Sequence, residues 1–210
     1  MKINNVTKIL PLLNWSEEGD FYHVQVIARK KDNPDLGKNA RHLYHFYIES
    51  EKHLVKMFPE MVMLTEFHNA RLMINLNKRN YKKLALRTVK KIIEQIENGA
   101  EKHIRNALHS VVGTYASDPD KTWIVDIDND DSSFKQLDGT FDEFVNNTIN
   151  DIIACRGSEK SRMVQLIPTH NGVHLITRPF DIKEFGTNSW RCAQVDIHKD
   201  NPTLLYSNIQ

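Results

Sequence analysis

Two aspartates, Asp126 and Asp128, close the apolar run that begins at Trp123 and reads Trp-Ile-Val-Asp-Ile-Asp. Residues i and i+2 of a strand point to the same face, so the two carboxylates are expected side by side. Carboxylates held that close repel each other unless a cation lies between them. Oxygen ligands of this kind suit Mg²⁺ or Mn²⁺, which complete their shells with water and substrate phosphates. The run indicates a divalent-metal site that handles phosphates; the alternative is a solvated acidic turn continuing through Asn129 and Asp130.

A second segment, Thr169-His-Asn-Gly-Val-His174, predicts a hairpin that could bind a phosphate. The glycine at position 172 would expose backbone N–H groups in the turn and let an anion approach closely. His174 follows it by two residues, at the start of a strand, and could hydrogen-bond a phosphate oxygen. The alternative is an ordinary hairpin whose histidine packs on the sheet.

A third aspartate, Asp196, lies within the apolar run Val-Asp-Ile of a predicted strand over 190–197. A carboxylate on such a strand is costly to bury unless it is paired or bound to a metal. On an edge strand it could instead be solvated.

The order of these three segments resembles the catalytic core of the archaeo-eukaryotic primase superfamily, the primase-polymerases. The first motif of that family, a strand ending in Asp-x-Asp, is matched by Asp126-Ile-Asp128. The second, Ser-x-x-Gly-x-His, is matched by 169–174, with threonine in place of the usual serine and His170 where a glycine is common. The third, one acidic residue on a hydrophobic strand, is matched by Asp196. The resemblance covers 70–197 and is specific over 122–197.

This resemblance implies metal-dependent nucleotidyl transfer. Asp126, Asp128 and Asp196 would be the catalytic residues and would hold two Mg²⁺ or Mn²⁺ ions roughly 3.5–4 Å apart. His174 would contact the phosphates of an incoming nucleotide, with Thr169 and the backbone of Gly172 nearby. The implied partners are nucleoside triphosphates, a DNA or RNA template, and a helicase or other replication subunit.

Basic side chains that could serve nucleotide or nucleic-acid binding are spread along the chain. Arg71 is notable because it lies on the polar face of a predicted strand, and Arg178 ends the strand that His174 begins; an ordinary surface arginine is the alternative for Arg178. The remaining candidates are Arg29, Lys30, Lys31, Lys78, Arg79 and Arg191. Lys82, Lys83, Lys90 and Lys91 are expected on a solvated helix face.

The predicted elements mix hairpins with helices, which favours an α+β fold. We expect an N-terminal α/β module over 1–118, packed with a catalytic module over 119–210. The latter is a mostly antiparallel, RRM-like sheet flanked by helices. Predicted strands cover 21–28, 42–48, 70–77, 122–128, 163–167, 173–177 and 190–197, and predicted helices cover 80–97, 100–115 and 141–155.

Composition sets few further limits. The 210 residues carry a formal net charge of +1, and the hydrophobic fraction of 40% is ordinary for a globular protein. Two cysteines, Cys155 and Cys192, without a Cys-x-x-Cys pair argue against a cysteine-built zinc site and against a disulfide framework. No run approaches the ~20 apolar residues of a membrane helix, and no signal-peptide core follows Met1. A soluble cytoplasmic protein without membrane contact is expected.

Two other functions fit the same residues. A metal-dependent phosphohydrolase or nuclease could use the Asp126–Asp128 pair. A haloacid-dehalogenase-type phosphatase needs threonine or valine where Asp130 stands, and it places the motif near the start of the domain. A non-catalytic nucleic-acid-binding or replication-scaffold protein with a primase-like fold is the third hypothesis.

Overall fold

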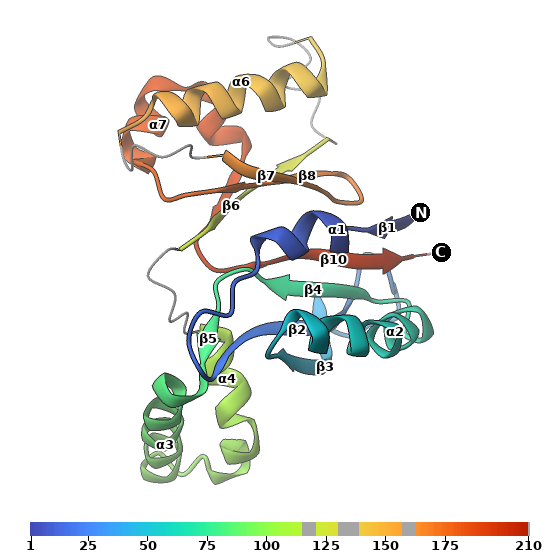
Figure 1. The fold of residues 1–210 in the computed structure, drawn as a ribbon, viewed down its shortest axis with the longest axis vertical. Helices are drawn as coiled ribbons and strands as arrows, with labels where there is room; N and C mark the ends of the chain where they lie inside the picture. The colour runs from blue at the N-terminus through green and yellow to red at the C-terminus, as the bar shows by residue number, and fades with distance from the viewer. Residues whose placement is uncertain (115–120, 130–138, 157–162, 210) are drawn as a thin grey trace. The chain divides into compact units, whose positions relative to one another are not determined.

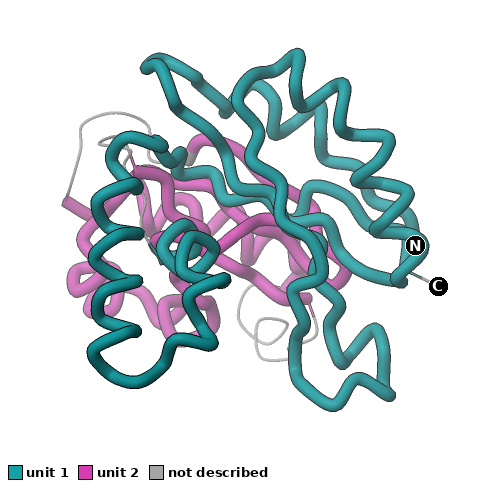
Figure 2. Tube along the Cα trace, turned by 90° about the horizontal axis from the view of Figure 1, so that it is seen from below, with its two compact units in different colours: residues 1–119, 204–210 teal, residues 120–203 magenta. Residues whose placement is uncertain are grey.

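The structure is a computed structural model that describes residues 1–114, 121–129, 139–156 and 163–209 (Figure 1). Two compact units divide the chain: Met1–Pro119 with Leu204–Gln210, and Asp120–Thr203 (Figure 2). The sequence predicted a boundary at 118/119 with every later residue in the catalytic module. The C-terminal segment differs from that prediction, because its strand completes the sheet of the first unit.

The first unit is built on a sheet with strand order β1-β10-β4-β2-β3, in which β5 also pairs with β2. Its central strand β2 is buried along nearly its whole length, as expected for a strand with neighbours on both edges. The predicted strands at 21–28, 42–48 and 70–77 correspond to β2, β3 and β4. The strands are β1 (Lys2–Asn4), β2 (Asp20–Arg29), β3 (Ala40–Ile48), β4 (Arg71–Asn75), β5 (Arg79–Asn80) and β10 (Pro202–Asn208).

The two long helices of the first unit, α2 and α3, begin at side-chain caps. Ser50 accepts a hydrogen bond from the backbone of His53 at the start of α2, and Asn80 accepts from Lys82 and Lys83 at the start of α3. The predicted helix at 80–97 is confirmed as α3. The predicted helix at 100–115 begins instead as a 3-10 segment. The helical segments are α1 (Val6–Ile9), η1 (Leu10–Leu12), α2 (Glu51–Phe67), α3 (Tyr81–Glu97), η2 (Glu101–Asn106) and α4 (Ala107–Thr114).

The second unit is a sheet with strand order β7-β8-β6-β9 and antiparallel pairing throughout. Val125, Ile127 and Leu175 point to one face and form a buried core with residues of two helices, including Phe144 and Phe185. The elements are β6 (Trp123–Asp128), α6 (Phe141–Ala154), β7 (Met163–Pro168), β8 (Gly172–Thr177), α7 (Ile182–Asn188), η3 (Trp190–Gln194) and β9 (Asp196–His198).

The predicted hairpin and its preceding helix are confirmed. A capping box fixes the start of α6: Thr140 accepts from the backbone of Glu143, whose carboxylate accepts from the backbone of Thr140. The predicted strands at 163–167 and 173–177 are β7 and β8, which pair in antiparallel register.

The predicted strand at 190–197 is wrong over most of its length. Ser189 accepts a hydrogen bond from the backbone of Arg191 and starts the 3-10 segment η3, and the Trp190 ring packs against Phe144 at 5.8 Å. Only Asp196 and Ile197 belong to a strand. The sequence analysis also missed α2 and β10.

The α+β class is confirmed, with two largely antiparallel sheets and helices. No helix among the described residues is both long and apolar enough to span a membrane.

Candidate active site

Strand β6 brings the three sequence motifs of the second unit onto one row across the sheet. Asp126 lies directly opposite His174 on β8 and directly opposite Asp196 on β9. Alternation along β6 turns Val125 and Ile127 into the core, so Asp126 and Asp128 share the other face. Opposite residues of antiparallel strands have Cβ atoms about 4.5–5.5 Å apart, so the row is compact. This row carries two carboxylates and an imidazole from segments far apart in the chain.

His174 is held from both sides of its ring. Its Nδ1 lies 2.8 Å from Oγ1 of Thr203, and its Nε2 lies 3.4 Å from Oδ1 of Asp126. A Thr203 hydroxyl that donates to Nδ1 leaves the Nε2–H directed at the Asp126 carboxylate. His174 is buried, whereas the Asp126 side chain keeps 29% exposure. The imidazole is therefore fixed beside a carboxylate that solvent and ligands can reach.

Thr203 itself does not act as a nucleophile in this arrangement. The geometry of hydroxyl, imidazole and carboxylate has the order of a hydrolase triad, but Thr203 is fully buried. A nucleophile must reach the substrate, so the hydroxyl serves to orient His174. The sequence analysis missed Thr203, which carries no recognisable motif and lies outside the predicted strands.

Gly172 is required by a close approach between β8 and β6. A Cβ built on it would lie 1.9 Å from the carbonyl oxygen of Ile127 and 2.9 Å from Cα of Asp128. Every other residue type would push the two strands apart at the position where Asp128 stands, because Asp128 pairs with Gly172. The glycine of the second motif thus sets the separation between the hairpin and the aspartate strand.

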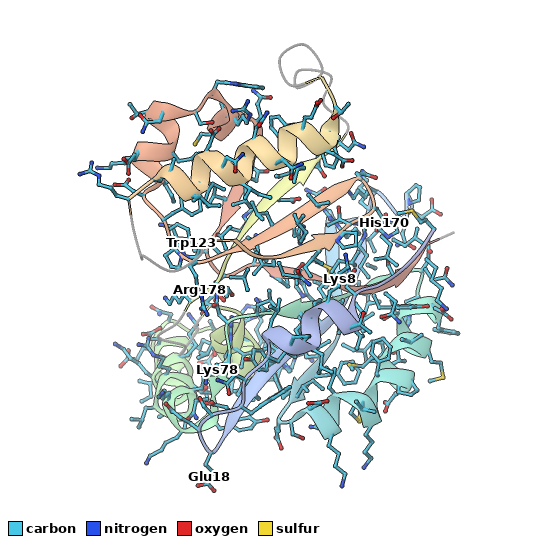
Figure 3. The ribbon with its side chains drawn as sticks, turned by 45° about the horizontal axis from the view of Figure 1, so that its top comes forward. Lys8, Glu18, Lys78, Trp123, His170 and Arg178 are labelled. Atoms are coloured by element: carbon cyan, nitrogen blue, oxygen red, sulfur yellow. The ribbon has the colours of Figure 1, made fainter. Side chains whose placement is uncertain are left out.

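The hairpin turn and the end of β6 are tied together by backbone hydrogen bonds. Asn129 N–H donates to the carbonyl of Asn171 at 2.5 Å, and Thr169 N–H donates to that of Gly172 at 2.9 Å. Figure 3 shows His170 at this turn. The turn borders an open depression of about 370 Å³, with Phe141 from the start of α6 as its aromatic wall. Its other lining residues are Asn129, Thr169, His170, Asn171 and Gly172.

Arg71 and Arg178, the two arginines predicted to bind nucleotide, do not lie in this row. The last residue of β8, Thr177, pairs with Trp123 at the start of β6. Arg178 follows Thr177 and therefore lies at the other end of the sheet from the hairpin (Figure 3). Arg71 belongs to the first unit, where its Nε and Nη2 each lie 2.7 Å from a carboxylate oxygen of Asp32. This buried bidentate pair gives Arg71 a structural role that its alternating pattern did not reveal.

The carboxylates have the right chemistry for a hard divalent cation. Asp126 and Asp196 face each other across one row, and Mg²⁺ is often held by one or two carboxylates, with waters and substrate phosphates as the other ligands. Within the described parts of the chain, no three His, Cys, Asp or Glu side chains converge closely enough to hold one ion. The carboxylates of Asp126 and Asp196 could thus hold a cation whose other ligands are waters and phosphate oxygens. The centre of three aspartates stays a prediction.

Comparisons of this chain with family models, with curated proteins and with solved structures found no match. Function is therefore inferred from the geometry of the second unit.

Proposed function

We propose that the second unit carries out metal-dependent nucleotidyl transfer, in the manner of a small primase-polymerase. The row Asp196–Asp126–His174 is the observation that supports it most strongly. Three short motifs meet on one face of one sheet, in the order that the resemblance to primase-polymerases requires. Aspartates that are only solvated gain nothing from lying opposite each other beside a buried histidine.

Each residue would have a distinct part in the reaction. Asp126 and Asp196, with Asp128 two residues further along β6, would hold Mg²⁺ or Mn²⁺. The bound cation would neutralise the triphosphate and lower the pKa of the attacking 3′-hydroxyl. His174, oriented by Thr203, would donate from Nε2 to a phosphate oxygen once Asp126 turns toward the cation. These contributions are positioning and charge neutralisation, with no covalent enzyme intermediate.

The depression beside the hairpin supplies a place for the rest of the nucleotide. Its volume of about 370 Å³ falls in the range of small-ligand sites. The Phe141 ring could stack on a base, an interaction that accepts every base because each has a π-face. The exposed backbone of the turn between Thr169 and Gly172 could donate to phosphate oxygens.

Binding of a nucleoside triphosphate tests this assignment. Calorimetric titration of ATP or dATP in the presence of Mn²⁺ should detect binding to the unmodified protein. The Asp126→Asn variant should bind at least about tenfold more weakly, which is ~1.4 kcal/mol. Asp142→Asn is the matched control, since Asp142 is an exposed acid of the same unit on the first turn of α6.

The outcome separates the proposed function from its competitors. Nucleic-acid binding that is unchanged by EDTA and by the Asp128→Ala substitution would favour a non-catalytic binding protein. Release of phosphate or nucleotides without templated incorporation would favour a phosphohydrolase or nuclease. Nucleotide binding that is unchanged by both EDTA and Asp126→Asn would contradict the assignment of the site.

A further inference from the structure

Helix α3 exposes an apolar stripe that the fold of the first unit leaves uncovered. Its members are Leu86, Val89, Ile93 and Ile96, with relative exposures of 79%, 54%, 50% and 50%. Their spacing of three, four and three residues places them on one side of the helix, as the a and d positions of a coiled coil do. Four large aliphatic side chains at least half exposed on one line form a contiguous patch, which is unusual on an isolated surface.

This stripe is separate from the side of α3 that holds the helix to its unit. The inner side is anchored by Leu84, which is buried with Phe21 of β2 and with Val111 and Val112 of α4. Figure 1 shows α3 lying beside α4. The stripe is therefore a second apolar side on a helix that already has its intramolecular contacts.

Charge along α3 is divided between its two halves. The half from Tyr81 to Lys91 contains five basic residues and no acid, whereas the half from Ile92 to Glu97 contains Glu94 and Glu97 and no base. This distribution opposes the helix dipole, which favours acids at the N-terminus and bases at the C-terminus. The basic residues are Lys82, Lys83, Arg87, Lys90 and Lys91.

Two ion pairs of the described residues involve these charges. Lys83 lies 3.0 Å from Glu17, and Lys91 lies 3.8 Å from Glu94 of the same helix. The side chains of both pairs are about half exposed, so water competes for them and they can be exchanged for other partners. A charge pattern that is unfavourable within one helix becomes favourable beside a helix of opposite polarity.

We propose that the stripe of α3 pairs with the same stripe of a second copy of this chain, with the two helices antiparallel. In that arrangement Leu86 of one copy faces Ile96 of the other, and Val89 faces Ile93. The basic half of each helix lies against the acidic half of the other, and the two helix dipoles oppose each other. The surface is complementary to itself, which is the requirement for a two-fold symmetric interface.

The resulting dimer is weak, because four side chains are a small contact. Stable interfaces bury about 800 Å² per partner, and a smaller one is expected to form a dimer only at high protein concentration. Oppositely charged halves also make the association sensitive to ionic strength.

Sedimentation equilibrium on the full chain tests the association. The unmodified protein should shift from monomer to dimer between about 1 µM and about 200 µM, and the shift should weaken in high salt. The double variant Val89→Ser, Ile93→Ser should raise the dissociation constant at least about tenfold. The matched control is Val55→Ser, Met63→Ser on α2, whose side chains are 62% and 60% exposed. A monomer at the highest concentration, or a dimer that the α3 double variant leaves unchanged, overturns the proposal.

Disulfide trapping tests the orientation and stays decisive if the serine variant folds poorly. Leu86→Cys and Ile96→Cys are made separately in a Cys192→Ser background, where the remaining Cys155 is buried. An antiparallel pair predicts a cross-link when the two proteins are mixed and little cross-linking of either alone, because a disulfide needs Cα atoms about 4.4–6.8 Å apart. Cross-linking of the Leu86→Cys protein with itself would show a parallel pair and would refute the antiparallel arrangement.

Discussion

Replacing Gly172 by alanine changes the molecule at the point where the hairpin approaches the aspartate strand most closely. The added Cβ would lie 1.9 Å from the Ile127 carbonyl oxygen, whereas real Cβ atoms essentially never come within 3.0 Å of another heavy atom. The two strands must therefore separate by more than 1 Å at this pair. The obstacle is backbone, so no side-chain rotation relieves it.

The cost follows from two contributions. Overpacking against a rigid neighbour costs about 1–3 kcal/mol. Loss of one or two ladder hydrogen bonds between β6 and β8 adds about 1 kcal/mol each. We expect Gly172→Ala to lower the free energy of unfolding by about 3 kcal/mol and to displace Asp128, so that nucleotide binding with Mn²⁺ weakens as well.

Urea unfolding followed by tryptophan fluorescence measures this change, since Trp123 and Trp190 both belong to the second unit. Gly186→Ala is the control, because a Cβ there makes only an ordinary contact of 3.6 Å with Sγ of Cys192 and the residue lies inside α7 of the same unit. Alanine should stabilise that helix by about 0.5–1 kcal/mol. A Gly172→Ala protein within about 0.5 kcal/mol of the unmodified one would refute the steric argument.

Two further changes address the histidines. Burial, together with the charges of His45 and Arg79, lowers the pKa of His23 from 6.5 to about 3. The folded state thus favours the neutral ring, and stability is fully present above pH 6.5 and is lost as the pH falls toward 3. By pH 4 this loss should reach about 3 kcal/mol, and His23→Gln should remove most of that pH dependence in urea unfolding, whereas His103→Gln at an exposed position should not. Thr203→Val should lower the free energy of unfolding by about 1–2 kcal/mol, because it leaves Nδ1 of the buried His174 without its hydroxyl partner. Thr187→Val, exposed on α7, should change it by less than about 0.5 kcal/mol in the same assay.

Periodicity in the sequence predicted β6 and the β7–β8 hairpin of the site, but not the bounds of the strand that carries Asp196. The apolar residues of β6 alternate around the two aspartates, and Gly172 lies between two strand-like runs, so the sheet and its hairpin were both expected. Pairing between distant strands is not encoded in local pattern. Only the register of the sheet shows that Asp126 lies directly opposite both His174 and Asp196.

Other features depended on tertiary contacts that a sequence pattern does not contain. Arg71 lies on the polar face of an alternating strand, where a ligand-binding residue is expected. Its position is explained instead by the buried carboxylate of Asp32, which is far away in the sequence. The residues from Trp190 to Gln194 are strand-like in composition and fold as a 3-10 turn, because Ser189 caps them and Trp190 packs on α6. The helix predicted over 80–97, with a solvated lysine face, is present as α3. The sequence pattern did not show that most of its apolar side would stay exposed.

Templated nucleotide incorporation is the measurement that bears most directly on the central claim. A primer annealed to a longer template is incubated with the full chain, nucleoside triphosphates and Mn²⁺ or Mg²⁺, and the products are resolved by length. We expect template-dependent extension that EDTA abolishes, a loss of at least about a hundredfold in Asp126→Asn and in Asp196→Asn, and unchanged extension in Asp142→Asn. Extension by the two site variants at the rate of the unmodified protein, with all of them folded, would contradict the central claim.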